Sequence, residues 1–207
     1  HDPHSWGKPL SALLGALKMQ TAFGLPSIGG KDSMSGTFED ISVPPTLIAF
    51  GINTVKTQNV ISPELKWDGN RLYLIKHTPL PDRMPDTEQL KANWNFIHSK
   101  IESGEIVSGW AVGFGGVAEA LAKMAFGNSF GVNVKMPEEE LYDLSYGSVV
   151  VEAAGALDFP TAILLGEVTD GEDGKLHING GADPGPDHRY DRCRLSDSQE
   201  RARCGYS

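Results

Sequence analysis

The sequence has 207 residues, of which 40% are hydrophobic, and a formal net charge of −9 at pH 7 with a pI near 5.1. This length and apolar content allow one large folded domain or two small ones. The acidic balance argues against nucleic acids and membrane surfaces as partners, because phosphate backbones and anionic lipids select clustered Lys and Arg. No apolar run reaches the roughly 20 residues of a membrane helix and no leader pattern opens the chain, so we expect a cytoplasmic protein.

The first predicted element is a helix over residues 8–23, where Leu and Ala recur at helical spacing. A glycine-rich segment follows at 26–36, and an extended run at 45–52 comes after it. A Walker-type phosphate loop needs strand, loop and helix in that order. Here a helix comes first, and Gly30 stands where the lysine of such a loop would be, so the sequence predicts no Walker loop.

The glycine-rich segment has the composition of a phosphate-binding turn. Adjacent Gly29 and Gly30 permit positive φ angles and a close approach to a ligand. Lys31 can neutralise a phosphate and Asp32 can hold a divalent cation, with the hydroxyl of Ser33 beside them. We therefore expect a phosphate-binding turn, although an ordinary solvated turn before a strand has the same composition.

Extended runs and helical patterns alternate through the rest of the chain, after a polar connection at 56–67 that is a candidate domain boundary. The run at 161–168 is expected to pair with the one at 175–179 across the turn between them. The sequence predicts an α/β domain of five or six strands, with strands at 71–75, 105–112, 130–134, 148–152, 161–168 and 175–179 and helices at 87–103, 117–126 and, briefly, within 137–143.

A second glycine turn, with Gly113, Gly115 and Gly116, separates the predicted strand 105–112 from the predicted helix 117–126. It matches the dinucleotide pattern G-x-G-x-x-A in the required context, so the amides that open the helix could hold a phosphate. The acidic residue expected some 20 positions further on is only ambiguously supplied. The turn therefore predicts an anion site more than a nicotinamide site.

Three other features of the sequence do not indicate a functional site. The match to G-x-S-x-G at 127–131 follows a helix and precedes a strand, the reverse of a nucleophile elbow, so we interpret it as chance. The histidines have no metal-ligand spacing, and the two cysteines, Cys193 and Cys204, lie near the C-terminus. Residues 181–207 contain five arginines and one large aliphatic residue, Leu195, so we expect a disordered or artefactual tail.

Four segments together resemble the phosphoribosylformylglycinamidine synthase family, in its large form: residues 26–38, 43–52, 61–66 and 115–134. The likeness covers about residues 1–180 in order. The most specific part is the run Gly-Lys-Asp-Ser-Met-Ser at 30–35 followed by a strand that opens with paired prolines.

The resemblance implies an α/β, PurM-like (aminoimidazole ribonucleotide synthetase-like) fold. Residues 1–60 would be the end of the N-terminal domain of the second synthetase repeat. Residues 61–180 would be the C-terminal α/β domain of that repeat, with 181–207 as the tail.

The resemblance also implies an activity. In that family ATP activates the amide oxygen of formylglycinamide ribonucleotide, and ammonia released from glutamine displaces phosphate. The cofactors would be ATP or ADP and magnesium, and the partners the first synthetase repeat and the glutaminase domain. This chain alone would be inactive, and exposed sheet in its incomplete first domain could cause self-association.

Family contacts carry over to three positions of the first glycine segment. Nucleotide, magnesium and substrate contacts would fall on Gly30, Lys31 and Ser33 respectively. Because lysine cannot ligate magnesium, we expect Lys31 to act on phosphate by its charge and Asp32 to be the nearest candidate metal ligand.

The second glycine turn departs from the family. Many members have Asp-x-Ser-Asp-Gly-Gly where this chain has Ala-Val-Gly-Phe-Gly-Gly at 111–116, so both acids and the hydroxyl are missing. Backbone amides could still bind a phosphate there. The alternative hypothesis is that this half of the enzyme is a scaffold or holds only a structural nucleotide.

Overall fold

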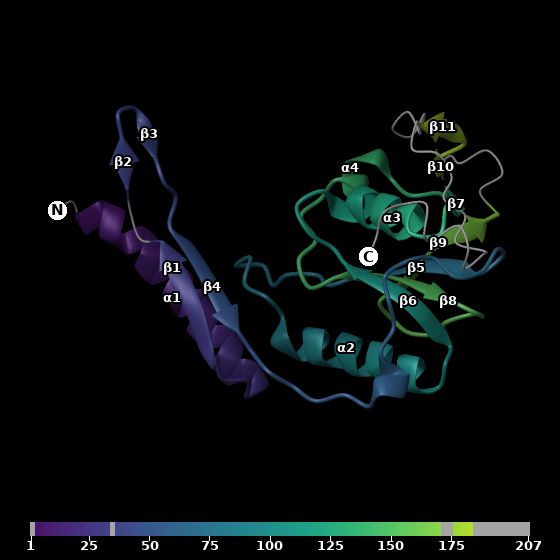
Figure 1. Cartoon of the computed structure of the whole chain (residues 1–207), viewed down its shortest axis with the longest axis horizontal. Helices are drawn as coiled ribbons and strands as arrows, with labels where there is room; N and C mark the ends of the chain where they lie inside the picture. The colour runs from purple at the N-terminus through teal and green to yellow at the C-terminus, as the bar shows by residue number, and fades with distance from the viewer. Residues whose placement is uncertain (1–2, 34–35, 171–175, 184–207) are drawn as a thin grey trace, which may run out of the picture.

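The computed structural model describes residues 3–33, 36–170 and 176–183 and has two parts joined by an extended linker, residues 51–60 (Figure 1). The N-terminal arm comprises the described residues up to 50, and the α/β domain begins at 61. The linker contains a short 3-10 helix, η1 (Thr57–Asn59). Among the described residues, no helix combines the length and apolarity needed to cross a bilayer.

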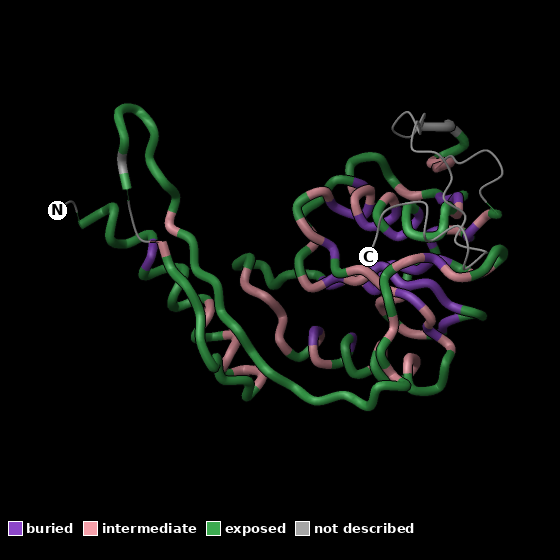
Figure 2. Tube along the Cα trace, viewed as in Figure 1, coloured by how far each residue is buried: buried purple, intermediate pink, exposed green. Residues whose placement is uncertain are grey.

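The arm consists of one long helix against a two-stranded sheet. The helix is α1 (Pro3–Phe23), and the sheet pairs β1 (Gly29–Ser33) antiparallel with β4 (Thr46–Phe50). Two short strands, β2 (Thr37–Phe38) and β3 (Ile41–Ser42), form a hairpin between them. The arm buries little, as the mostly green tube in Figure 2 shows.

The prediction of a turn at Gly29–Ser33 is wrong, because this segment is strand β1. Neither Gly29 nor Gly30 has a positive φ angle. All five residues pair in register with β4, from Gly29 opposite Phe50 to Ser33 opposite Thr46. Pairing with a partner 13 or more residues away along the chain has overridden the local turn preference of Gly, Asp and Ser.

The α/β domain is built on a seven-stranded sheet in the order β11-β10-β7-β9-β5-β8-β6. All neighbours are antiparallel except β10 and β7. The strands are β5 (Arg71–Ile75), β6 (Ile106–Ala111), β7 (Gly131–Val134), β8 (Val149–Ala153), β9 (Ala162–Thr169), β10 (Leu176–Ile178) and β11 (Gly181–Asp183).

Two expectations about this end of the sheet are wrong. Strand β10 does not pair with β9, because β5 and β7 already occupy both edges of β9, and β10 instead adds to the free edge of β7. The tail expected to be disordered from residue 181 begins with strand β11, which pairs with β10. The remainder of that tail lies outside the described residues.

Helices cover both faces of the sheet: α2 (Thr87–Glu102) lies on one face, and α3 (Gly116–Phe126) and the short α4 (Glu138–Leu141) lie on the other (Figure 1). Strand alternation explains the two layers. Leu72 and Leu74 of β5 belong to the core beneath α3, whereas Tyr73 and Ile75 pack with side chains of α2. Most of the buried chain in Figure 2 lies here.

Helix α2 begins at Thr87 as predicted and ends at Glu102, one residue before the predicted end. The Asp86 carboxylate accepts hydrogen bonds from the backbone N–H groups of Glu88 and Gln89, each at 3.1 Å. After the helix, Gly104 adopts a φ of 77°, the left-handed conformation that glycine tolerates at helix ends.

A buried carboxylate on the sheet accepts hydrogen bonds from the segment through which the chain enters the α/β domain. Glu152 of β8 has 0% exposure and accepts hydrogen bonds from the backbone N–H groups of Lys66 and Trp67, at 2.8 and 3.0 Å. It also accepts one from the Asn70 side-chain amide at 2.7 Å. Three donors compensate for the removal of this charge from water.

Glu64 in the same segment predicts an acid-dependent loss of stability. A hydrogen bond from Ser62, then its own backbone N–H, then Lys66 lower the pKa of Glu64 from 4.5 to about 2. Its folded pKa is lowered, so its contribution to stability is complete above pH 4.5 and is lost as the pH falls towards 2. Because the side chain is 36% exposed, we expect this contribution to stay below about 1 kcal/mol.

Urea unfolding between pH 6 and pH 2 tests this. Unmodified protein should lose more stability across the interval from 4.5 to 2 than Glu64→Gln does. Parallel pH profiles for the two proteins would contradict the expectation.

Candidate functional site

The first candidate site is a groove of about 660 Å³ between α1 and the β1–β4 sheet. This size is in the range of small-molecule sites. All five residues of β1 line it, and the charged residues of its lining are Lys31 and Asp32. The rest is largely apolar, with side chains from α1 that include Trp6, Leu10 and Leu13.

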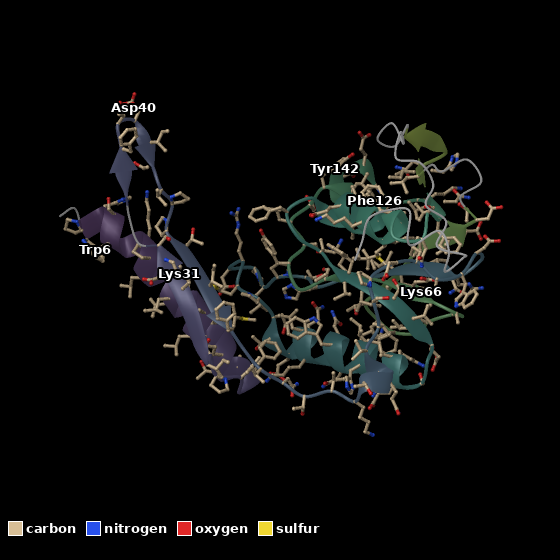
Figure 3. The ribbon with its side chains drawn as sticks, viewed as in Figure 1. Trp6, Lys31, Asp40, Lys66, Phe126 and Tyr142 are labelled. Carbon is tan, nitrogen blue, oxygen red and sulfur yellow. The ribbon has the colours of Figure 1, made fainter. Side chains whose placement is uncertain are left out.

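Strand alternation separates the polar residues of β1. Lys31 and Ser33 point to one face of the two-stranded sheet and Asp32 to the other. The Lys31 ammonium donates a hydrogen bond to the backbone carbonyl of Asp32, and the side chain is exposed on the arm (Figure 3). A phosphate held by Lys31 would therefore meet Ser33 rather than the Asp32 carboxylate.

Gly30 has a packing role that the composition of its segment did not reveal. A Cβ atom at Gly30 would overlap the Ile48 carbonyl oxygen, whereas one at Gly29 would lie 3.9 Å from the Phe50 ring, an ordinary contact. Gly30 therefore permits the close approach of β1 and β4.

We predict that Gly30→Ala separates β1 from β4, at a cost of about 1–3 kcal/mol to their pairing. Gly29→Ala is the matched control and should leave the pairing intact. Amide hydrogen exchange of residues 46–50 measures this directly. Equal exchange rates in the two variants would contradict the assignment.

The second candidate site is the glycine turn between β6 and α3. Gly116 has a φ of 66°, and its N–H donates to the Gly113 carbonyl at 3.1 Å. A Cβ there would lie 2.5 Å from the Leu141 carbonyl oxygen and 2.7 Å from Tyr142 Cα. The turn thus depends on glycine for both its backbone angle and its contact with the end of α4.

One amide of this turn already has a side-chain partner. The Gly115 N–H donates to Glu119 Oε2 at 2.9 Å. The Lys123 ammonium, 2.7 Å from the Glu119 carboxylate, and then the Gly115 N–H hold the pKa of Glu119 below its ordinary value. A phosphate that used the Gly115 amide would have to displace this carboxylate.

The two candidate sites are separate. The lining of the groove contains none of residues 113–116, and Figure 1 shows β1 on the arm and the β6–α3 turn in the α/β domain. Sequence reasoning missed Glu119, although it follows Gly115 by four residues and so lies about one helical turn away.

A magnesium ion has little support from side chains alone. The described residues contain no group of three or more His, Cys, Asp or Glu side chains that could hold a metal. Magnesium at nucleotide sites commonly takes one or two carboxylates together with phosphate and water oxygens. Asp32 could supply one carboxylate, but only to an ion on its own face of β1, opposite the face of Lys31 and Ser33.

Comparison with known proteins identifies the fold. PurL of Thermotoga maritima complexed with AMPPCP is similar to the chain, with a TM-score of 0.52 and 14% identity, and the likeness covers 65% of this chain and 27% of PurL. For PurLQS of the same organism the TM-score is 0.49 and the identity 14%, and the likeness covers 66% of this chain and 28% of that one. For thiamine monophosphate kinase of Aquifex aeolicus the TM-score is 0.42 and the identity 11%, and the likeness covers 66% of this chain and 57% of the kinase.

The protein therefore has the PurM-like fold, as the family resemblance implied. The chain spans about a quarter of the length of the PurL structure that it matches. No protein-family model matches the sequence. No curated protein matches it at a significant level either.

Proposed function

We propose that this chain is part of a phosphoribosylformylglycinamidine synthase, the ligase that converts formylglycinamide ribonucleotide to its amidine with ATP and glutamine. The observation that carries the proposal is the likeness to PurL in fold, in a chain whose residues 26–38 and 115–134 resemble that family in sequence. Such an enzyme would work in the cytoplasm.

In this proposal β1 supplies phosphate contacts to ATP or ADP. Lys31 is the cation of the groove, and Ser33 adds a hydroxyl on the same face of the sheet. The expectation that Asp32 ligates a magnesium ion arriving with the nucleotide does not form part of the proposal, because the Asp32 carboxylate points to the opposite face of β1 from Lys31 and Ser33. Gly30 permits the close pairing of this strand with β4, and Gly29 precedes it in the strand.

The proposed partners are the first synthetase repeat and the glutaminase domain. The arm leaves large apolar side chains of α1 about half exposed, among them Leu13, Leu14 and Leu17. A folded domain normally covers such a surface. In the complete enzyme the rest of the repeat would cover it, and the isolated chain would self-associate through it.

Two observations favour a second function, in which this half holds no nucleotide and acts as a scaffold. The groove around Lys31 is largely apolar, which suits polypeptide better than phosphate. At the glycine turn, Glu119 occupies the Gly115 amide. Under this alternative, substitutions in β1 would affect stability or assembly and leave turnover unchanged.

Thermal unfolding with and without ADP and Mg²⁺ tests the proposal. A ligand present at 100 times its Kd stabilises the folded chain by about 2.7 kcal/mol. We expect a clear rise in Tm for the unmodified chain and for the control Lys18→Met, an exposed position of α1 outside the groove. Lys31→Met should lose most of that rise.

The absence of any shift at millimolar ADP would favour the scaffold. In the complete enzyme, unchanged turnover after Lys31→Met would likewise overturn the role given to this lysine.

A further inference from the structure

The arm meets the α/β domain through an aromatic contact. Phe23, the last residue of α1, stacks on Trp94 of α2, with ring centroids 5.0 Å apart and an angle of 26° between the rings. The Lys91 ammonium lies 6.0 Å from the centre of the Phe23 ring. Stacked aromatic rings favour one mutual orientation, so this contact restrains the direction in which α1 leaves the domain.

Trp94 is also hydrogen-bonded to a loop of the domain. Its Nε1–H donates to the Gly147 carbonyl at 3.1 Å. Gly147 has a φ of 86°, and a Cβ there would overlap the Leu90 side chain of α2. His77 also holds this loop, through a bond of 2.8 Å between its Nδ1 and the Tyr146 carbonyl. The loop at 142–148 is thus fixed closely against α2.

The same loop supports the glycine turn. Gly116 packs on the backbone of Tyr142, and the rings of Phe114 and Tyr146 meet edge to face, with centroids 6.3 Å apart at 87°. A continuous set of contacts therefore runs from Phe23 on the arm, through Trp94, to the turn at 113–116.

We infer that Trp94 is a positioning residue that sets the arm, with Lys31 on it, relative to the loop behind the glycine turn. The functional importance of those two segments rests on the proposed function. The positioning itself does not, because every contact in the set joins residues of this chain without a ligand.

Two substitutions separate the two contacts of Trp94. Phe23→Ala removes the ring on the arm and leaves the bond to Gly147 in place. Trp94→Phe keeps a ring for Phe23 to stack on and removes the N–H donor. Leu17→Ala, at an exposed position of α1, is the control for shortening a side chain on the arm.

The distance between spin labels at Lys18→Cys and Asp158→Cys measures the placement of the arm in the full chain, with Cys193 and Cys204 replaced by Ser. Both label positions are exposed, the first on α1 and the second on a loop of the domain. We expect one narrow distance distribution for the parent, Leu17→Ala and Trp94→Phe proteins, and a broad one for Phe23→Ala. A broad parent distribution, or a narrow one in Phe23→Ala, would overturn the inference.

Amide hydrogen exchange tests the other contact. Trp94→Phe should exchange about fivefold faster at residues 142–148, the factor expected for the loss of one hydrogen bond of ordinary strength. An unchanged rate there would remove Trp94 from the support of the loop. Both measurements are made without nucleotide, so their failure is distinct from a failure of nucleotide binding.

Discussion

Glu152→Gln is expected to lower the free energy of unfolding by about 3 kcal/mol, because it sets an amide N–H₂ group against backbone N–H donors in a site with no access to water. The carboxylate is fully buried and accepts from Lys66, Trp67 and Asn70. A glutamine has one acceptor oxygen, so at least one of these donors loses its partner. Urea unfolding followed by far-UV circular dichroism measures the change.

Glu139→Gln is the control for the loss of one negative charge. Glu139 is exposed on α4, and its substitution should change stability by less than about 0.5 kcal/mol. If Glu152→Gln were as stable as this control, Glu152 would not be the anchor of the segment that enters the domain.

Gly116→Ala is the second substitution with a large expected effect. The left-handed backbone adds about 1–2 kcal/mol for a residue with a Cβ, and overpacking against Leu141 and Tyr142 adds about 1–3 kcal/mol. At about 2–4 °C per kcal/mol, the Tm should fall by roughly 10 °C.

Gly155→Ala is the matched control, because a Cβ there meets nothing within 4 Å and its φ is not positive. Differential scanning calorimetry of the two variants should separate them clearly. Equal values of Tm would mean that the turn rearranges without cost, and the contact between α3 and α4 would lose its structural importance.

Local signals in the sequence predicted most of the α/β domain. Strand β5 has the predicted bounds, and helix α2 begins after the Asp86 cap and stops before Gly104. These features depend on residues within one or two turns of each other, so composition and periodicity reveal them. The order of the strands was not predictable in the same way, because the partner of β10 is decided by which sheet edge is free.

In the candidate sites, too, features that depend on nearby residues were predictable and those that depend on distant residues were not. Glycine, lysine and serine at 29–33 were identified as a segment of interest, but their strand geometry depends on β4, which is distant in the sequence. The Glu119 carboxylate that occupies the second turn is local and could have been found. The contact of Trp94 with Gly147 joins residues 53 positions apart, and no local pattern predicts it.

Hydrogen exchange of the full chain with and without millimolar ADP and Mg²⁺ tests the central claim most directly, because it locates any bound nucleotide on the sequence. The proposal that β1 contacts phosphate predicts slower exchange at residues 29–33 and in the paired strand at 46–50, with the effect lost in Lys31→Met. Unchanged exchange in both strands, or protection confined to other parts of the chain, would contradict it and leave this half of the enzyme as a scaffold.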